Sequence, residues 1–260
     1  MKVISSHDNK YIKLASSLKY RKYREEEKMF LVEGKRAVEE ALERPELIET
    51  MFLDESMGAD YQIRDLPPDC YLLPSSLMKH VCCTENPQGI AAIVRKPVWL
   101  WGDLVNKSGL LILLDRVSDP GNMGSILRTC WALGVEGVLM TKGCVDPFSP
   151  KVVRSTMGAI INVPIFTEVS EQQLDTLHED LKYAFICTDI NIGEKYYSVK
   201  YSSRSLLIIG SEAQGVSNEI KKRCDRFINI PMNPRVDSLN VAAACAIIVA
   251  ETWRQYHDDI

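Results

Sequence analysis

Two apolar stretches toward the end of the 260-residue chain are each followed by a loop that carries polar side chains. The run 206–209 has the length of a buried strand, and it leads to the carboxylate of Glu212. The run 227–230 is a second strand candidate, and Ser238 and Asn240 follow it. Ligands of open α/β sheets bind beyond the carboxyl ends of the strands. The pattern therefore predicts a ligand site, because burying these polar side chains without partners would cost free energy.

A further polar pair, Asn122 and Arg128, follows the apolar run 110–114. We expect Asn122 to be the N-cap of a helix that spans residues 123–133 and ends at Gly134. A spacing of six corresponds to roughly 600° of helix rotation, so the two side chains do not share a face. Arg128 is either a surface charge or part of the site, and its apolar neighbours favour the second interpretation.

Three stretches resemble, in order, the motifs of the SpoU (TrmH) family of RNA 2′-O-ribose methyltransferases. LLILLDRVSDPGNMGSILRTCWALGV (110–135) is similar to motif 1, and IIGSEAQGVSNEI (208–220), INIPM (228–232) and VDSLNVAAACAII (236–248) are similar to motifs 2 and 3. Three ordered motifs with matching spacing are far more specific than one. The resemblance implies a knotted (trefoil) parallel-sheet α/β domain of the SPOUT superfamily, which binds S-adenosyl-L-methionine.

The resemblance also assigns site residues. The positions of the family's catalytic residues are occupied by Asn122, Arg128, Glu212, Ser238 and Asn240. The donor-contacting positions are Thr188, Gly210, Ile230, Met232 and Leu239. Gly210 is also expected on physical grounds, because a residue without Cβ permits close approach of a ligand. Ile230 and Leu239 can equally be core residues, Asn122 a plain helix cap, and Ser238 the cap of the last helix.

Methyl transfer to a ribose 2′-oxygen requires alignment of the methyl group with that oxygen, loss of the hydroxyl proton and a positioned phosphate. A guanidinium is a poor proton acceptor, with a pKa above about 12. Either its surroundings shift the pKa of Arg128, or Arg128 orients the hydroxyl while the RNA phosphate or solvent takes the proton. Arg154 lies in a segment that resembles the one after motif 1, and we expect it to contact a second phosphate.

The sequence departs from the family pattern in the loop between INIPM and SLN, where Pro234 stands in place of the usual glycine. Proline fixes φ near −65° and has no N–H to donate. We therefore expect a local difference in this loop, with an effect on donor binding. Ala213 at another usual glycine position is a milder departure.

Residues 1–97 alternate strand and helix patterns and predict a small α/β domain. FLVEGKRAVEEAL and TENPQGIAAIV resemble the L30e-like substrate-binding domain that precedes many SpoU catalytic domains. The resemblance implies RNA contact at Lys35 and Arg36. Residues 98–108 form a linker, whose Trp99 and Trp101 either dock onto a domain or stack on bases. Residues 109–260 form the expected methyltransferase domain.

Composition limits the remaining classes of function. The net charge is −4, but residues 1–36 hold ten Lys or Arg and five Asp or Glu, so this segment is basic and the remainder acidic. Such a segment suits local RNA contact or is a solvated helix face. The eight cysteines lack a regular spacing, which predicts reduced core thiols and no metal site. No run has the length of a membrane span, and the first residues lack a secretory pattern, so we expect a cytoplasmic protein.

We expect ribosomal RNA as substrate, because the resemblance associates an L30e-like domain with large-subunit rRNA. A tRNA 2′-O-methyltransferase and a catalytically degenerate RNA-binding protein of the same fold are the alternatives, the second supported by Pro234. A nicotinamide-dependent enzyme is disfavoured, because no G-x-G-x-x-G follows the run 110–114.

The segment 241–250 is apolar on every side, so a helix there must be covered all round. The helix expected at 123–133 also carries apolar residues on several faces. Copies from two chains would bury both helices in an isologous interface, unless the N-terminal domain covers them. SPOUT enzymes are commonly dimers, so the resemblance implies a homodimer through the catalytic domain, in which Arg128 serves its own pocket or that of the partner.

Overall fold

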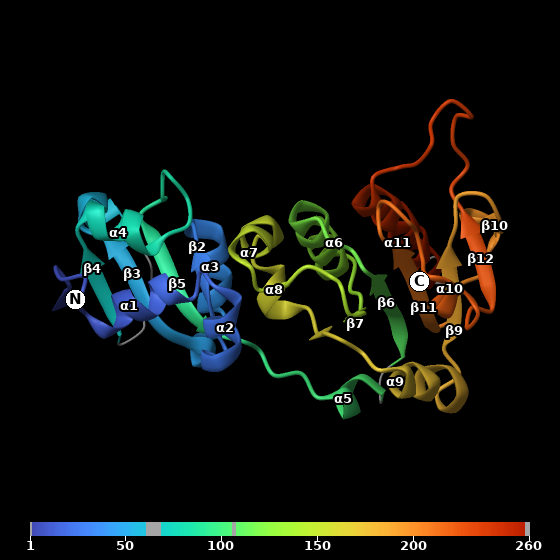
Figure 1. The fold of residues 1–260 in the computed structure, drawn as a ribbon, viewed down its shortest axis with the longest axis horizontal. Coiled ribbons are helices and arrows are strands. Elements are labelled where there is room, and N and C mark those ends of the chain that lie inside the picture. Colours follow the sequence, from blue (N-terminus) through green and yellow to red (C-terminus); the bar gives the residue numbers. More distant parts are fainter. Residues whose placement is uncertain (1, 61–68, 106–107, 258–260) are drawn as a thin grey trace. The chain divides into compact units, whose positions relative to one another are not determined.

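The computed structural model describes residues 2–60, 69–105 and 108–257. The chain divides into two compact units (Figure 1). The first unit comprises Met1–Val98 and Asp146–Ile161, and the second comprises Trp99–Val145 and Asn162–Ile260. Each unit is built around one sheet with helices packed against it.

The sheet of the first unit has the order β1-β4-β3-β5-β2. Its strands are β1 (Lys2–Val3), β2 (Met29–Glu33), β3 (Ile48–Asp54), β4 (Cys70–Leu73) and β5 (Ile90–Arg95). β5 is antiparallel to β2 and β3, and the other pairs are parallel. The helices are α1 (Lys10–Ser17), α2 (Arg21–Glu27), α3 (Lys35–Leu42), α4 (Ser75–Val81), α7 (Pro150–Thr156), α8 (Ala159–Asn162, whose last residue belongs to the second unit) and the 3₁₀ turns Pro45–Leu47 and Glu55–Asp60. The expected small α/β unit is therefore present.

Residues 146–161 pack with the first unit although the sequence pattern places them in the second domain. Arg24 is buried at 3% exposure, and its Nη2 donates to Asp146 Oδ2 at 2.6 Å. The ring centroids of Phe30 and Phe148 lie 5.1 Å apart. A buried guanidinium requires such a partner, since an isolated buried charge is costly. The segment thus supplies both an ion pair and apolar packing to the first unit.

The second unit contains a seven-stranded parallel sheet with the order β10-β12-β9-β11-β6-β7-β8. Its strands are β6 (Gly109–Asp115), β7 (Gly137–Met140), β8 (Ile165–Phe166), β9 (Ala184–Thr188), β10 (Glu194–Lys195), β11 (Arg204–Gly210) and β12 (Arg226–Asn229). The helices are α5 (Trp101–Val105), α6 (Pro120–Ala132), α9 (Glu171–Asp175, continued by a π-helical turn Thr176–Asp180), α10 (Asn218–Lys221), α11 (Val241–His257) and the 3₁₀ turn Tyr196–Ser198.

The central strands β6 and β11 are buried along almost their whole length, which explains their continuous apolar runs. Their register pairs Gly210 with Asp115, so both strands end at the same edge of the sheet. Trp101 docks against Phe166 with ring centroids 5.4 Å apart, as expected for one linker tryptophan. No helix in the described parts of the chain is long and apolar enough to cross a membrane.

Candidate active site

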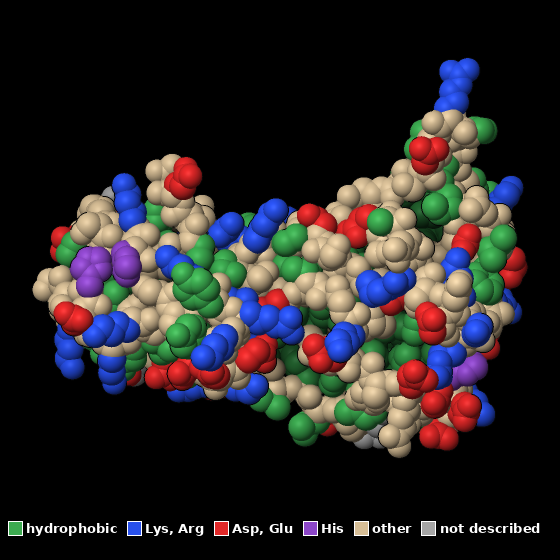
Figure 2. All heavy atoms as spheres, in the orientation of Figure 1, with side chains coloured by type: hydrophobic (Ala, Val, Ile, Leu, Met, Phe, Trp, Pro, Cys, Tyr) green, Lys and Arg blue, Asp and Glu red, His purple; other side chains and the backbone are tan. Residues whose placement is uncertain are grey.

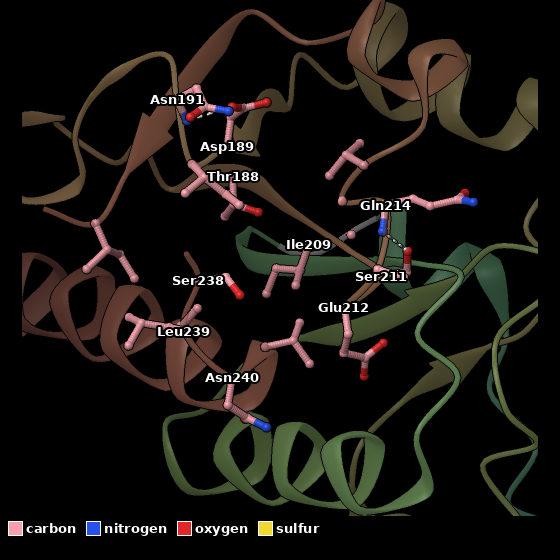
Figure 3. A pocket seen from close by; sticks show the side chains of 18 of the residues that line it. Thr188, Asp189, Asn191, Ile209, Ser211, Glu212, Gln214, Ser238, Leu239 and Asn240 are labelled. Carbon is pink, nitrogen blue, oxygen red and sulfur yellow. Dashed lines mark hydrogen bonds between the residues drawn. The ribbon is translucent and has the colours of Figure 1, made fainter. Parts of the chain in front are cut away.

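A pocket of about 650 Å³ opens where β9, β11 and β12 end in the second unit. Figure 3 shows that its side chains come from the loops after these strands and from the segment that leads into α11. We call it the strand-end pocket. It is lined by all five predicted donor-contacting residues and by three predicted catalytic ones: Thr188, Gly210, Ile230, Met232, Leu239, Glu212, Ser238 and Asn240. The structure therefore brings together residues from three segments, the loops after β9 and β11 and the stretch between β12 and α11.

Gly210 ends β11 and is required by its own loop. A Cβ at this position would lie 2.0 Å from the carbonyl carbon of Gly215 and 2.1 Å from the nitrogen of Val216. Ser211 and Gly215 pair in both directions, with N···O distances of 3.2 and 2.9 Å, and hold the turn closed. The sequence prediction gave ligand approach as the reason for this glycine. The structure adds a second reason, because main chain of the 210–216 loop occupies the space that a Cβ would need.

A chain of hydrogen bonds connects the predicted catalytic side chains. Asn122 Nδ2 donates to Glu212 Oε1 at 2.7 Å, and Asn240 Nδ2 donates to Asn122 Oδ1 at 2.8 Å. Asn240 Oδ1 in turn accepts from the main-chain nitrogens of Ala242 and Ala243, at 2.9 and 3.2 Å. The first turn of α11 thus fixes the orientation of Asn240, then of Asn122, and presents one oxygen of Glu212 to an amide.

These contacts correct two predicted helix caps. α6 begins at Pro120, and its N-cap is Asp119, whose Oδ1 accepts from Asn122 N at 2.8 Å. Asn122 therefore lies within the first turn, and its side chain is available for the network. Asn240, rather than Ser238, caps α11. Proline at the first helical position and aspartate before it are the signals that the sequence interpretation overlooked.

Asp115 joins three loops beside the pocket and was not singled out from the sequence. It is 2% exposed; its Oδ1 accepts from Thr141 Oγ1 at 2.9 Å, and its Oδ2 accepts from Ser217 N at 2.7 Å. The next residue, Arg116, has a φ of 58°, a left-handed conformation that costs free energy in a residue with a side chain. Its Nη1 donates to Gln214 Oε1 at 3.0 Å. The signal available in the sequence for this residue was a single aspartate at the end of an apolar strand.

One wall of the pocket is an ion pair. Lys221 Nζ lies 2.6 Å from Asp189 Oδ2, and Asn191 N donates to Asp189 Oδ1 at 2.9 Å. Burial acts to raise the pKa of the Asp189 carboxyl, but the bonds from Lys221 and Asn191 outweigh it and hold that pKa below its usual range. The hydrogen bond that Lys221 donates to Asp189 raises the pKa of Lys221. Thr188 Oγ1 donates to Ile208 O at 3.0 Å, which fixes that side chain at the end of β9.

Pro234 stands in a turn that suits proline. Val236 N donates to Asn233 O at 2.9 Å, and Arg235 N donates to Asn233 Oδ1 at 3.0 Å. Pro234 therefore occupies the second position of a four-residue turn, where a fixed φ is favourable and no N–H is needed. The pocket is lined from either side of this turn, by Met232 and by residues 237–240. Proline thus shapes the tip of the loop, which projects from the second unit in Figure 1.

The remaining predicted residues lie elsewhere. Arg128 is exposed on α6, and it is not among the described residues that line the strand-end pocket. Lys35, Arg36 and Arg154 all line a second pocket, of about 610 Å³, within the first unit. We call it the α3 pocket. In Figure 2, Lys and Arg side chains lie among Asp and Glu side chains over the face shown. RNA phosphates would therefore meet small groups of cations on this face and not one large basic surface.

Comparison with known proteins identifies the class. Residues 109–250 match the SpoU rRNA Methylase family, and residues 9–92 match the MRM3-like substrate binding domain. The chain is 30% identical over 249 residues to the 23S rRNA (guanosine(2553)-2′-O)-methyltransferase RlmP of Bacillus subtilis (strain 168), covering 96% of this chain and 98% of the relative. It is 29% identical to rRNA methyltransferase 3, mitochondrial, of Xenopus laevis, covering 95% and 74%.

Comparison with solved structures leads to the same class of protein. The AdoMet-bound rRNA methyltransferase from Sinorhizobium meliloti is similar with a TM-score of 0.84 and 27% identity, over 98% of each chain. The SpoU methyltransferase AviRb from Streptomyces viridochromogenes, in complex with the cofactor AdoMet, is similar with a TM-score of 0.84 and 27% identity, over 96% of this chain and 100% of that one. The chain belongs to the SpoU rRNA methylase family, and the expected family, α/β fold and donor are confirmed.

The strand-end pocket fits S-adenosyl-L-methionine. Its volume is within the usual range of ligand pockets, roughly 300 to 1,000 Å³. Apolar side chains that can enclose a purine and the carbon chain beside the sulfonium line it: Ile209, Ile230, Met232, Leu239, Val241 and Ile248. Polar groups that can bond ribose hydroxyls and an amino-acid head lie among them, including Thr188, Asp189, Asn191 and Ser211. When bound there, the donor supplies an electrophilic methyl group.

Proposed function

We propose that the protein transfers a methyl group from S-adenosyl-L-methionine to the 2′-hydroxyl of a ribosomal RNA nucleotide. The observation that carries the proposal is the bonded chain Asn240–Asn122–Glu212, at the rim of a donor-sized pocket at the strand ends. These hydrogen bonds fix the orientation of polar side-chain atoms beside the place where the donor would present its methyl group.

In this proposal, Glu212, Asn122 and Asn240 orient the ribose and keep its hydroxyl in line with the methyl group. Ser238 adds a hydroxyl from the segment before α11. Thr188, Gly210, Ile230, Met232 and Leu239 surround the donor and exclude water from it. Arg128 contacts the RNA phosphate and the hydroxyl. Because a guanidinium is a poor proton acceptor, the hydroxyl proton passes to the RNA phosphate or to solvent.

Transfer of a tritiated methyl group from the donor to total RNA tests this proposal. We expect incorporation with the unaltered protein and a loss of about hundredfold in Glu212→Gln and Asn122→Ala, because the network that positions the ribose is broken. Lys222→Gln, an exposed residue after α10, serves as a control with unchanged rate. Intact RNA binding without any incorporation would instead indicate a catalytically degenerate RNA-binding protein.

Ribosomal RNA is the proposed substrate over transfer RNA, because the two relatives described above match nearly all of this chain and are named for rRNA. Mapping 2′-O-methyl groups in RNA from a deletion strain should reveal one missing mark in rRNA. A missing mark in tRNA, with none in rRNA, would overturn this choice. We place the protein in the cytoplasm and away from membranes, since its RNA substrate is there.

We further propose that the protein is a homodimer through the second unit. Ala243, Ala250 and Trp253 of α11 are exposed, and Ile247 between them is half-buried, so an apolar face of this helix is open to a partner. Arg128 then contributes to the pocket of the partner subunit. Sedimentation equilibrium should give twice 29.4 kDa, and a single 29.4 kDa species would contradict the dimer. When Arg128→Ala and Glu212→Ala chains are mixed, methyl-transfer activity should recover if each site is shared by two subunits. Proven subunit exchange without recovery of activity would argue that the site is not shared.

A further inference from the structure

The turn 211–215 carries Glu212, and a second side chain of the same turn is bonded to the end of β6. Arg116, directly after β6, donates from Nη1 to Gln214 Oε1 at 3.0 Å. Glu212 Oε1 accepts from Asn122 Nδ2 at 2.7 Å. Figure 3 shows that Glu212 and Gln214 leave the turn in different directions. The turn is therefore held from two sides, by α6 through Asn122 and by the end of β6 through Arg116.

Arg116 is held in an unfavourable state. Its φ of 58° is a left-handed conformation that is uncommon for a residue with a Cβ. Its Nε is buried and has no hydrogen-bond partner in the parts of the chain that the structure describes, although it lies 3.5 Å from Asp115 Oδ1. A buried donor without a hydrogen bond adds a second cost in free energy. Backbone strain persists only where the surrounding structure enforces it, and it is concentrated at functional sites.

The loop after β7 enforces this conformation. Thr141 Oγ1 accepts from Arg116 N at 3.1 Å and donates to Asp115 Oδ1 at 2.9 Å. Gly143 has a φ of 98°, and a Cβ there would lie 3.3 Å from Cγ of Arg116 and 3.9 Å from its Cδ. The aliphatic part of Arg116 therefore lies against the main chain of Gly143. Main chain and side chain of Arg116 are both fixed by contacts within the protein.

The bond from Arg116 to Gln214 contributes little to the overall stability of the fold. The side chain of Arg116 is 37% exposed and Gln214 is exposed, so water can replace either partner and the net free energy of the bond is small. The bond instead restricts where the tip of the turn lies. Catalysis is sensitive to such a restriction, because a displacement of about 1 Å in an orienting group can lower a rate about a hundredfold.

We propose that Arg116 is a positioning residue for methyl transfer, which acts through Gln214 to fix the turn 211–215 in the form that lets Glu212 orient the ribose. This inference rests on the proposed function, because it assigns the effect to methylation of RNA. It goes beyond that function by giving a role to a residue that is not among the described residues lining the strand-end pocket. The strain at Arg116 lowers stability, and the bond that this conformation permits raises kcat.

Arg116→Gly separates these two effects, because glycine adopts a positive φ without strain and removes the side chain. We expect the melting temperature to stay equal or to rise. We expect kcat for methyl transfer to an rRNA fragment to fall about tenfold, while the KM of the donor changes by less than about twofold. An unchanged kcat would overturn the inference. A fall in melting temperature together with kcat would indicate a merely structural role and would also overturn it.

Lys182→Gly is the matched control. Lys182 is an exposed cation of the second unit with a φ of 57°, and it lies after the π-helical turn, outside the residues that line the strand-end pocket. Glycine relieves the same backbone strain there without removing a contact to the turn 211–215. We therefore expect an equal or higher melting temperature and an unchanged kcat.

A double-mutant cycle tests whether Arg116 acts through Gln214. Gln214→Leu should lower kcat by the same factor as Arg116→Gly, and the double variant should lose no more than either single variant, since all three lack the same bond. Losses that multiply would overturn the inference. Hydrogen exchange of the donor-free protein gives a readout that needs no activity. The amides of residues 211–217 should exchange faster in both single variants and not in Lys182→Gly, and unchanged exchange would contradict the positioning role.

Failure of this inference is distinguishable from failure of the proposed function. If the unaltered protein methylates RNA and Arg116→Gly does so at the same rate, the positioning role is wrong and the proposed function stands. If the unaltered protein transfers no methyl group to any RNA, both are wrong.

Discussion

At the scale of single residues, the strand-end pocket depends on places where a side chain would not fit. Gly210 is the clearest, because the space for its Cβ is filled by the main chain of Gly215 and Val216. We expect Gly210→Ala to lower the free energy of unfolding by about 3 kcal/mol and to abolish donor binding, since the 210–216 loop must move. Thermal unfolding and donor calorimetry measure both effects.

Gly102→Ala is the matched control for this substitution. Gly102 lies in α5, and a Cβ there meets no atom within 4 Å, so we expect stability to stay equal or to rise by up to about 1 kcal/mol. If Gly210→Ala behaved like Gly102→Ala, the closed form of the loop would not be required for the pocket.

The Asp189–Lys221 pair predicts a dependence of stability on pH. The pKa of Asp189 is lowered in the folded protein from its ordinary value of 3.8, so its stabilisation is present above that value. It is lost as pH falls through the lower, folded pKa. We expect Asp189→Asn to cost about 1 kcal/mol of unfolding free energy at pH 6, a cost that fades below pH 3.8. Urea unfolding across this range measures it, with the exposed Asp103→Asn as control; a cost independent of pH would refute the pair's role.

At the scale of elements, the apolar runs predicted most strands and helices because burial on both sides of a parallel sheet leaves a plain signature. The run 206–209 became β11, and the segment that resembles motif 1 became β6 and α6. The residues at which helices begin were harder to predict from the sequence. Asn122 and Ser238 are good caps by residue type, but Asp119 and Asn240 perform the capping because of the turns that precede the helices.

The site residues could be predicted from the sequence where the family resemblance supplied their positions. They could be predicted less well where tertiary contacts determine which side chains meet. The structure gathers eight of the predicted residues in one pocket, while Arg128 lies outside it. Asp115 and Asp189 escaped notice, since one ordinary aspartate at a strand end does not reveal which loops it will join. The sequence did not show whether Pro234 strains its loop, because this depends on the hydrogen bonds that Asn233 accepts within the turn.

The exposed face of α11 makes a prediction about assembly. Ala250→Glu places a carboxylate on this apolar face, so the dissociation constant of the proposed dimer should rise by about hundredfold or more. Sedimentation equilibrium should then show the 29.4 kDa monomer at micromolar concentration. Lys222→Glu, which changes charge on an exposed residue after α10, is the control and should remain dimeric. A dimer that persists in Ala250→Glu would place the interface elsewhere.

At the scale of the whole molecule, the first unit is completed by residues from the middle of the sequence. Asp146 is the counter-ion of buried Arg24, with side-chain exposures of 10% and 4%. We expect Asp146→Asn to lower the stability of the first unit by about 3 kcal/mol, because the buried guanidinium loses its charge partner. Hydrogen exchange of the β2 amides in the full-length protein should report the loss.

The exposed pair Asp8–Lys13 is the control for this effect. Its atoms approach to 2.8 Å, but the side chains are 88% and 62% exposed, so Asp8→Asn should change exchange in the first unit very little. Equal effects of Asp8→Asn and Asp146→Asn would mean that residues 146–161 do not support the first unit.

The dependence of Arg24 and Phe30 on residues 146 and 148 also sets an order of events on the ribosome. A nascent chain can form β2, β3 and β5 early, yet it cannot complete their packing until residue 161 has emerged. Residues 99–145, which begin the second sheet, leave the exit tunnel in the meantime. We therefore expect the first unit to stay incompletely packed on the ribosome until residues 146–161 have been made, so that the speed of translation through codons 99–161 affects the yield of native protein.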